Sequence, residues 1–275
     1  MESRKQSERE FHNLLRDKKL ESSVHFESLT ANKKYYSITR KSLKFVERWL
    51  SQKCLGKKVL DYCCGNGGRS LSIANLGAAQ VVGIDISDAS IENAKINASN
   101  EGINKKLQYF VMDAENMKFD SNTFDIVYEA GVLHHLNLER AYFEIARVLK
   151  PDGHCICIEA LGHNKIVHFY RKMTPHLRTG WELEHILKKK HISMANNYFS
   201  KVEIIGLFHL ATLAAVPFRN LQFIFNPLLK FMEFLDSLIL RLPLIKWQAW
   251  QVVFVLSKPS KDSNKVEQNS VKAII

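Results

Sequence analysis

Short apolar runs alternate along this chain with stretches in which apolar residues recur at helical spacing. The runs predict β-strands at residues 58–61, 80–86, 107–112, 124–128, 154–159, 201–207 and 250–256. The helical spacing predicts helices over 35–50, ahead of Gly77, ahead of Gly102 and over 137–149, with a turn at 151–153. Strands that alternate with helices indicate a parallel sheet with right-handed crossovers. The pattern therefore predicts an α/β fold: a Rossmann-like three-layer sandwich of about seven strands, mostly parallel.

Both ends of the chain and one long internal segment stand outside this alternation. Residues 1–20 have mixed charge and precede the first predicted helix, so we expect an N-terminal helical arm over 1–50 and a main domain over 51–257. A helical insert is expected at about 211–247, because a compact domain has no use for so long a loop. Within it, 227–242 has the pattern of an amphipathic helix. The polar residues 258–275 predict a disordered tail.

Charge and cysteine content limit the partners and the compartment. The formal net charge of +11 favours an anionic partner: nucleic acid, an anionic membrane surface, or a phosphate or carboxylate substrate. None of the five cysteines has the spacing of a zinc or redox motif, and the sequence shows no cluster of metal ligands. We therefore expect reduced thiols, no metal and a cytoplasmic protein. The N-terminus lacks a signal-peptide pattern, and the nearly apolar stretch 204–217 is too short to span a bilayer.

A glycine-rich turn follows the first predicted strand. It reads Asp-Tyr-Cys-Cys-Gly-Asn-Gly-Gly over residues 61–68 and leads into a helix. Glycines let a backbone bend tightly and approach a ligand, and the helix start offers free N–H groups. A dinucleotide motif needs glycine or alanine at the position of Ser70, so the match fails there. Asp61 would also repel a pyrophosphate. S-adenosylmethionine carries an ammonium and a sulfonium and no phosphate, so the loop favours that cofactor over NAD.

Residues 58–159 resemble the class I S-adenosylmethionine-dependent methyltransferases, whose first motif usually reads V-L-D-x-G-C-G-x-G. The departure is Cys63, where the family usually has its first glycine. The resemblance implies that Asp85 accepts the ribose hydroxyls, that Ile86 packs on the adenine, and that Asp113 with Ala114 meets the adenine amino edge. Each acid could instead be an ordinary strand-end or capping residue. The cofactor-binding residues expected from the resemblance are Asp61, Cys63, Gly65, Gly67, Asp85, Ile86, Asp113, Ala114 and Glu129.

Two further segments are candidates for the acceptor side. The run Leu-His-His-Leu at 133–136 is similar to one in small-molecule methyltransferases, where His135 would be a general base or a structural imidazole closing the cofactor pocket. The segment 162–184 is similar to one in bacterial quinone-type and sugar- or lipid-type methyltransferases. The alternative interpretation is a structural loop held by its own hydrogen bonds. The resemblance implies His135 and His176 as catalytic candidates, and His163, Tyr170, Arg171 and Arg178 as substrate-binding residues.

The favoured function is methyl transfer from S-adenosylmethionine to an oxygen or carbon of a small organic or lipid-like acceptor. The excess of basic residues is compatible with an anionic acceptor. Alternatives are a catalytically inactive cofactor-binding partner protein, an NAD-dependent oxidoreductase and an RNA methyltransferase. Nucleic acid is disfavoured because Glu-Ala-Gly-Val at 129–132 replaces the N/D-P-P-Y/F motif of amine-directed enzymes. The 227–242 helix would touch a membrane surface peripherally or simply pack on the rest of the protein. The sequence leaves the oligomeric state open.

Overall fold

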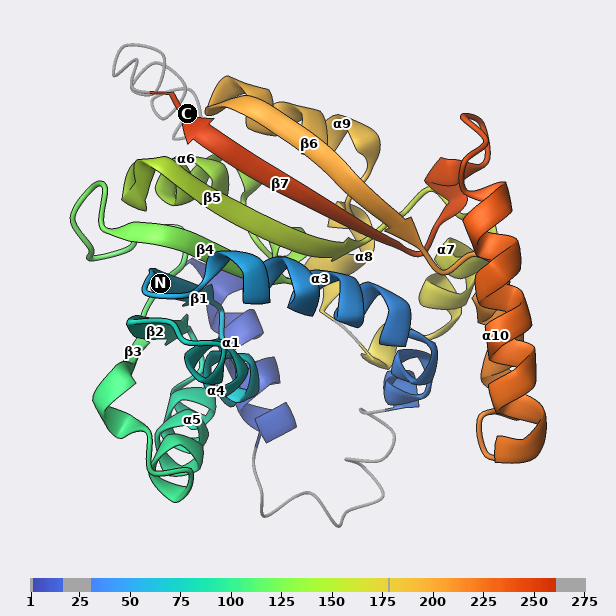
Figure 1. Cartoon of the computed structure of the whole chain (residues 1–275), viewed down its shortest axis with the longest axis horizontal. Coiled ribbons are helices and arrows are strands. Elements are labelled where there is room, and N and C mark those ends of the chain that lie inside the picture. Colours follow the sequence, from blue (N-terminus) through green and yellow to red (C-terminus); the bar gives the residue numbers. More distant parts are fainter. Residues whose placement is uncertain (1, 17–30, 178, 261–275) are drawn as a thin grey trace.

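A seven-stranded sheet forms the centre of the computed structural model, which describes residues 2–16, 31–177 and 179–260 (Figure 1). The strand order is β3-β2-β1-β4-β5-β7-β6. The first five strands run parallel, and β7 pairs antiparallel with both β5 and β6. The predicted Rossmann-like, mostly parallel sheet is confirmed. The strands are β1 (Lys58–Tyr62), β2 (Gln80–Asp85), β3 (Leu107–Val111), β4 (Phe124–Ala130), β5 (Leu149–Ala160), β6 (Phe199–Phe208) and β7 (Gln251–Pro259).

Helices cover both faces of this sheet, which makes the predicted three-layer sandwich. Neighbouring residues of a strand point to opposite faces, so Val59 and Leu60 belong to two different buried clusters. On one face lie α3 (Arg40–Lys53), α4 (Gly68–Asn75) and α5 (Asp88–Asn100). The other face packs against α6 (Leu138–Val148) and α9 (Lys189–Met194). The remaining helices are α1 (Ser3–Arg16), α7 (Lys165–Met173), α8 (Gly180–His185) and α10 (Gln222–Ile239).

Short 3-10 helices connect many of these elements. Two of them, η2 and η7, contact each other and help to form a third buried cluster with α10. A third, η4, carries both histidines of the 133–136 run. The 3-10 helices are η2 (Ala31–Ile38), η3 (Asn104–Lys106), η4 (Leu133–His135), η5 (Pro175–Leu177), η6 (Ala195–Asn197), η7 (Ala211–Phe218) and η8 (Lys246–Gln248).

Several predicted boundaries are wrong. The helix expected over 35–50 is divided at Thr39, whose hydroxyl donates to the carbonyl of Tyr36 at 2.8 Å and closes η2 before α3 begins. The insert helix begins at Gln222 rather than at 227. The turn expected at 151–153 lies inside β5: Phe124 pairs with Leu149 and Ile126 with His154, so the intervening residues bulge out without ending the strand.

The domain division at residue 50 stays a prediction. Its helical arm is present as α1, η2 and α3 in the described ranges. The helical insert before the last strand contains η7, α10 and η8. The disordered tail was expected from residue 258, but Lys258 and Pro259 belong to β7, where they extend the pairing with β6. Arg178 and residues 261–275, most of that expected tail, lie outside the described residues.

Candidate active site

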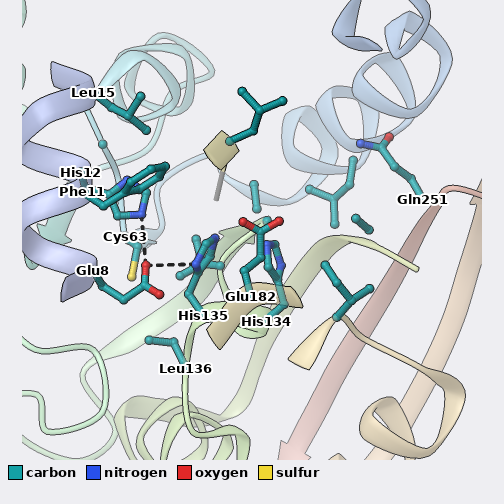
Figure 2. A pocket seen from close by; sticks show the side chains of 18 of the residues that line it. Glu8, Phe11, His12, Leu15, Cys63, His134, His135, Leu136, Glu182 and Gln251 are labelled. Atoms are coloured by element: carbon teal, nitrogen blue, oxygen red, sulfur yellow. Dashed lines mark ion pairs between the residues drawn. The ribbon is translucent and has the colours of Figure 1, made fainter. Parts of the chain in front are cut away.

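A cavity of about 850 Å³ opens at the edge of the sheet where the parallel strands end. Residues that follow β1, β2, β3 and β4 line one side of it, and α1 lies across that side. Residues of η2, α3, α7, η7 and the start of β7 line the other side. The fold therefore brings the glycine loop, the 133–136 run and the N-terminal helix to one place, which Figure 2 shows from close by.

The glycine loop has the left-handed backbone that its sequence suggests. Gly67 has a φ of +76°, and a Cβ at this residue would lie 2.7 Å from the hydroxyl of Tyr109. Cys63 adopts a φ of +59°, which L-residues reach at a cost of about 1–2 kcal/mol. The left-handed backbone explains why the resembling family usually has glycine at the position of Cys63.

Asp85 ties this loop to the end of β2. Its Oδ2 accepts the N–H of Gly65 at 2.9 Å, and its Oδ1 accepts the N–H of Ser87 at 2.9 Å. The carboxylate is 8% exposed and lines the cavity. Burial raises the pKa of Asp85, although both backbone N–H groups favour the ionised form. A buried carboxylate facing a cavity is a strong acceptor for ligand hydroxyls.

The residues at this end fit S-adenosylmethionine. The lining runs from the loop to the region beyond β3, and the glycine and acid positions that the resemblance requires are present except at Cys63. Six of the nine expected cofactor-binding residues line the cavity: Cys63, Gly65, Asp85, Ile86, Asp113 and Ala114.

The other three lie behind the cavity wall. Gly67 shapes the loop, as described above. Asp61 is 2% exposed and accepts a 2.5 Å hydrogen bond from the hydroxyl of Ser70, and burial raises its pKa to about 6. Glu129 accepts the N–H of Val132 at 2.8 Å. The direct cofactor contact that the sequence suggested for Asp61 and Glu129 stays a prediction.

Glu129 has a buried partner that the sequence reasoning missed. Burial and the charge of Glu159 raise the pKa of Glu129 well above its ordinary value. Burial alone would raise the pKa of Glu159. His134 Nδ1 lies 2.8 Å from Glu159 Oε2, and this interaction helps to lower the pKa of Glu159 below its ordinary value. The N–H of Leu133 donates to Glu129 Oε1 at 3.3 Å and to Glu159 Oε1 at 2.6 Å, so the two buried carboxylates anchor the 133–136 run to β4 and β5.

Helix α1 closes the cofactor end through polar contacts. Lys5 Nζ lies 2.8 Å from Asp113 Oδ2 and 3.1 Å from Glu115 Oε2. Arg4 donates to Glu115 Oε1 at 2.5 Å, and Arg9 donates to Asp88 on α5 at 3.0 Å. The helix thus covers the acid that the sequence assigned to the adenine edge. The sequence predicts a helical arm here but assigns it no site residue.

Glu8 and His12 of α1 meet His135 inside the cavity. Glu8 Oε2 lies 3.1 Å from His135 Nδ1 and 3.7 Å from His12 Nε2 (Figure 2). Burial acts to lower the pKa of His135, but Glu8 outweighs it and raises that pKa above its ordinary value. Burial and the charge of His135 lower the pKa of His12 to about 4. Burial alone would raise the pKa of Glu8, but the interaction with His135 helps to lower this pKa below its ordinary value. The i, i+4 spacing of Glu8 and His12 was the one signal of this cluster in the sequence.

The other end of the cavity is mostly apolar. Tyr35 packs edge-on against Tyr170 of α7 at 5.2 Å and against Trp250 at 6.1 Å between ring centroids. Tyr35 and Trp250 also pack against the buried cluster that contains residues of η7 and α10. The apolar residues that line this end are Tyr35, Tyr36, Leu43, Ile158, Ile166, Val167, Tyr170, Leu177, Ile186, Leu213 and Trp250.

The predicted acceptor residues are only partly brought together. Tyr170 and Arg171 line the cavity; Arg171 is 5% exposed and donates to the carbonyl of Leu161 at 3.2 Å. His163 accepts the N–H of Lys189 at 2.9 Å outside the cavity lining. His176 is exposed on η5, also outside the lining, so His135 is the catalytic candidate that reaches the cavity. Arg178 lies outside the described residues.

Part of this sequence is similar to known methyltransferases. Residues 60–157 match the family described as a methyltransferase domain. A sterol 24-C-methyltransferase of Aspergillus fumigatus is 37% identical over 132 residues, which are 48% of this chain and 35% of that protein. One from Gibberella zeae is 41% identical over 99 residues, 36% of this chain and 26% of that protein. The chain thus spans about a third or less of the length of these relatives.

Solved structures share the fold. Phosphoethanolamine N-methyltransferase 2 of Haemonchus contortus, in complex with phosphomonomethylethanolamine and S-adenosylhomocysteine, aligns with a TM-score of 0.58 at 19% identity, covering 88% of this chain and 59% of that one. Geranyl diphosphate C-methyltransferase from Streptomyces coelicolor aligns with a TM-score of 0.52 at 13% identity, covering 78% and 75%. At these identities the likeness is one of fold.

Proposed function

We propose that this chain, which carries a class I S-adenosylmethionine-dependent methyltransferase domain, transfers a methyl group to an oxygen or carbon of an apolar, lipid-like acceptor. One observation carries the proposal: a single cavity joins the cofactor residues at the strand ends to an end lined by aliphatic and aromatic side chains. A cavity of about 850 Å³ is large enough for a cofactor and a small second ligand.

The cofactor end supplies binding and orientation. S-adenosylmethionine, when bound, supplies a methyl group on a sulfonium, which is already a good leaving group. Asp85 offers a carboxylate for the ribose hydroxyls, and the left-handed loop around Gly67 lets backbone approach the ligand. Asp113 and Ala114 border the region beyond β3 where the resemblance places the adenine. The chain therefore has to align two ligands and exclude water.

The apolar end selects the acceptor. Ile158, Val167, Leu213 and Trp250 present few hydrogen-bonding groups, so a ligand there gains free energy by leaving water, about 25 cal/mol per Å² of buried apolar surface. Helix α1 covers the cofactor side and limits water access to the junction of the two ends. The sterol 24-C-methyltransferases matched by this domain also act on an apolar molecule, which supports the same class of acceptor here.

Turnover with a panel of acceptors tests this function. We expect formation of S-adenosylhomocysteine when the protein is given the cofactor with sterols or isoprenoid quinols. Leu213→Trp should fill the apolar end and raise the acceptor KM at least about tenfold, with the affinity for S-adenosylmethionine unchanged. Leu55→Trp is the matched control, because Leu55 is 76% exposed and lies outside the cavity lining. Cofactor binding without turnover on any apolar acceptor would favour the inactive partner protein instead.

We also propose that the acceptor reaches the cavity from an anionic lipid surface. Ile166 of α7 lines the cavity and is 82% exposed, so the cavity opens beside α7. Further along α7, Phe169 and Met173 are each 65% exposed, and on α10 Phe223 is 78% exposed. Both helices lie at the same end of the molecule, on the right of Figure 1. The exposed apolar residues of α7, α10 and the adjoining loops are Ile166, Phe169, Met173, Phe218, Leu221, Phe223, Phe231, Phe234, Leu238, Leu242, Leu244 and Ile245.

Charge complementarity selects the kind of surface. Lys165 and Lys172 on α7, and Lys230 on α10, are exposed among these apolar side chains. Exposed apolar patches rimmed by basic residues are typical of interfacial membrane contacts. In the described parts of the chain, no helix is long and apolar enough to cross a membrane. The proposed contact is therefore peripheral, and it extends the predicted 227–242 contact to α7.

Sedimentation with lipid vesicles checks this contact. We expect the protein to bind vesicles of phosphatidylserine and phosphatidylcholine, and to bind less as salt is raised. The double variant Phe223→Asp, Phe231→Asp should lower the vesicle partition coefficient at least about tenfold, because two exposed aromatic anchors are replaced by charges. Ile96→Asp on α5, where Ile96 is 43% exposed, is the control and should bind normally. Equal binding by both variants would contradict the contact.

A further inference from the structure

Three potential metal-ligating atoms converge on the cavity from two distant parts of the chain. Glu8, His12 and His135 each offer one ligand atom, and these atoms lie within 4.8 Å of one another. Glu8 and His12 are one turn apart on α1, while His135 is the last residue of η4, which follows β4 in the chain. Figure 2 shows the three side chains directed toward a common point next to Cys63. All three line the cavity.

The spacing of these atoms suits a small divalent ion. Zinc binds imidazole nitrogen and carboxylate oxygen at about 2.0–2.2 Å in a tetrahedral arrangement, which puts neighbouring ligand atoms about 3.3–3.6 Å apart. The separations from Glu8 Oε2 are 3.1 Å to His135 Nδ1 and 3.7 Å to His12 Nε2. The ligand nitrogens of His12 and His135 lie within 4.8 Å of each other, so these two side chains have to close to about 3.3–3.6 Å when an ion binds.

Two of these atoms are buried without a satisfied hydrogen bond. Glu8 is 5% exposed, and among the described residues neither Glu8 Oε2 nor His135 Nδ1 has a hydrogen-bond partner of good geometry, although the two are close together. Buried polar atoms in native proteins are nearly always satisfied, so such a pair points to a missing ligand. The other oxygen, Glu8 Oε1, accepts a 2.6 Å hydrogen bond from the hydroxyl of Thr179, which fixes the carboxylate.

The charges around this place are mixed. Arg4 and Lys5 of α1 are paired with Asp113 and Glu115. Arg16, which also lines the cavity, acts against positive charge on His12, whereas Glu8 favours it. On the far side, a carboxylate oxygen of Glu182 lies within 4.8 Å of ligand atoms of His134 and His135. Histidine ligands are commonly oriented by such neighbouring carboxylates.

We infer that Glu8, His12 and His135 form a binding site for a divalent transition-metal ion of the Zn²⁺ type. Two imidazoles and one carboxylate disfavour Mg²⁺ and Ca²⁺, which take oxygen ligands. Three protein ligands leave the fourth position open, and here it faces the cavity. Resting on the proposed function, the open position binds a hydroxyl of the acceptor and lowers the pKa of that hydroxyl beside the methyl group.

Metal titration of the whole chain tests this site without cofactor or acceptor. After treatment with a chelator, the protein should bind one equivalent of Zn²⁺ by calorimetry. Bound Co²⁺ should give the visible spectrum of nitrogen and oxygen ligands, without the thiolate charge-transfer band that the cysteines would produce. Glu8→Gln and His12→Ala should each lower the affinity at least about tenfold. Glu10→Gln, an exposed position on the same helix, should bind as the wild type does.

The outcomes separate the site from the methyl transfer. No stoichiometric binding, a thiolate spectrum, or unchanged affinity in both Glu8→Gln and His12→Ala would overturn the metal site and leave an ion pair between Glu8 and His135. Circular dichroism shows whether each variant is folded. If one of Glu8→Gln and His12→Ala fails to fold, the Zn²⁺ affinity of the other tests the site. A chain that binds one Zn²⁺ at these residues but methylates no acceptor would keep the site and reject the proposed function.

Discussion

Replacing Gly67 by alanine should lower the free energy of unfolding by about 2–5 kcal/mol. Gly67 has a φ of +76°, which costs an L-residue about 1–2 kcal/mol. The added Cβ would lie 2.7 Å from the hydroxyl of Tyr109 and 2.9 Å from the Cβ of Ala94. Both neighbours belong to the buried cluster on this face of the sheet, so relieving the overlap costs about 1–3 kcal/mol more.

Urea unfolding measures this loss, and the neighbouring residue supplies the control. Gly68 begins α4 and is exposed, and a Cβ added to it would meet no atom within 4 Å. Gly68→Ala should therefore leave the stability unchanged or raise it slightly, because alanine favours a helix. If Gly67→Ala were as stable as Gly68→Ala, the left-handed loop described above would be incorrect.

Replacing Asp85 by alanine should weaken binding of S-adenosylmethionine by about 1–3 kcal/mol, on the order of 10- to 100-fold. The change removes a buried carboxylate that lines the cofactor end of the cavity. It also leaves the N–H groups of Gly65 and Ser87 without their acceptor, which loosens the glycine loop. Both effects lower the affinity, since the loop and the carboxylate belong to one binding surface.

Calorimetric titration with S-adenosylmethionine, S-adenosylhomocysteine and NAD measures this effect. The wild type should bind the first two at micromolar concentration and not NAD. Glu92→Ala, an exposed acid on α5, is the control and should bind as the wild type does. Wild-type affinity in a folded Asp85→Ala variant would disprove the placement of the ribose at Asp85.

The hydrophobic pattern was sufficient for the sheet because each strand is a local feature. The run 80–86 becomes β2, and its last residues enter the site as Asp85 and Ile86. The loop at 61–68 was recognisable because glycine and acid positions at a strand end lie next to one another in the chain. The resemblance then supplied the roles of Asp85 and Asp113, which line the cavity as expected.

Local pattern failed where long-range pairing decides the structure. Pro-Asp-Gly at 151–153 is a turn sequence, yet it lies in β5 because β4 pairs with the strand on both sides of the bulge and β7 pairs with it from His154 onward. His176 stands in a segment similar to acceptor-binding ones, but packing leaves it exposed. Its neighbours in sequence do not determine the direction of its side chain.

The sequence by itself determined the α/β sheet, the glycine loop and the cofactor class, because short-range spacing encodes all three. Only the tertiary structure placed α1 over the cofactor end and Glu8 against His135, which is far away along the chain. It alone joined Tyr35, Tyr170 and Trp250 into one apolar end. Contacts between such distant residues depend on how the helices pack on the sheet, and no periodicity within a short window of sequence records that packing.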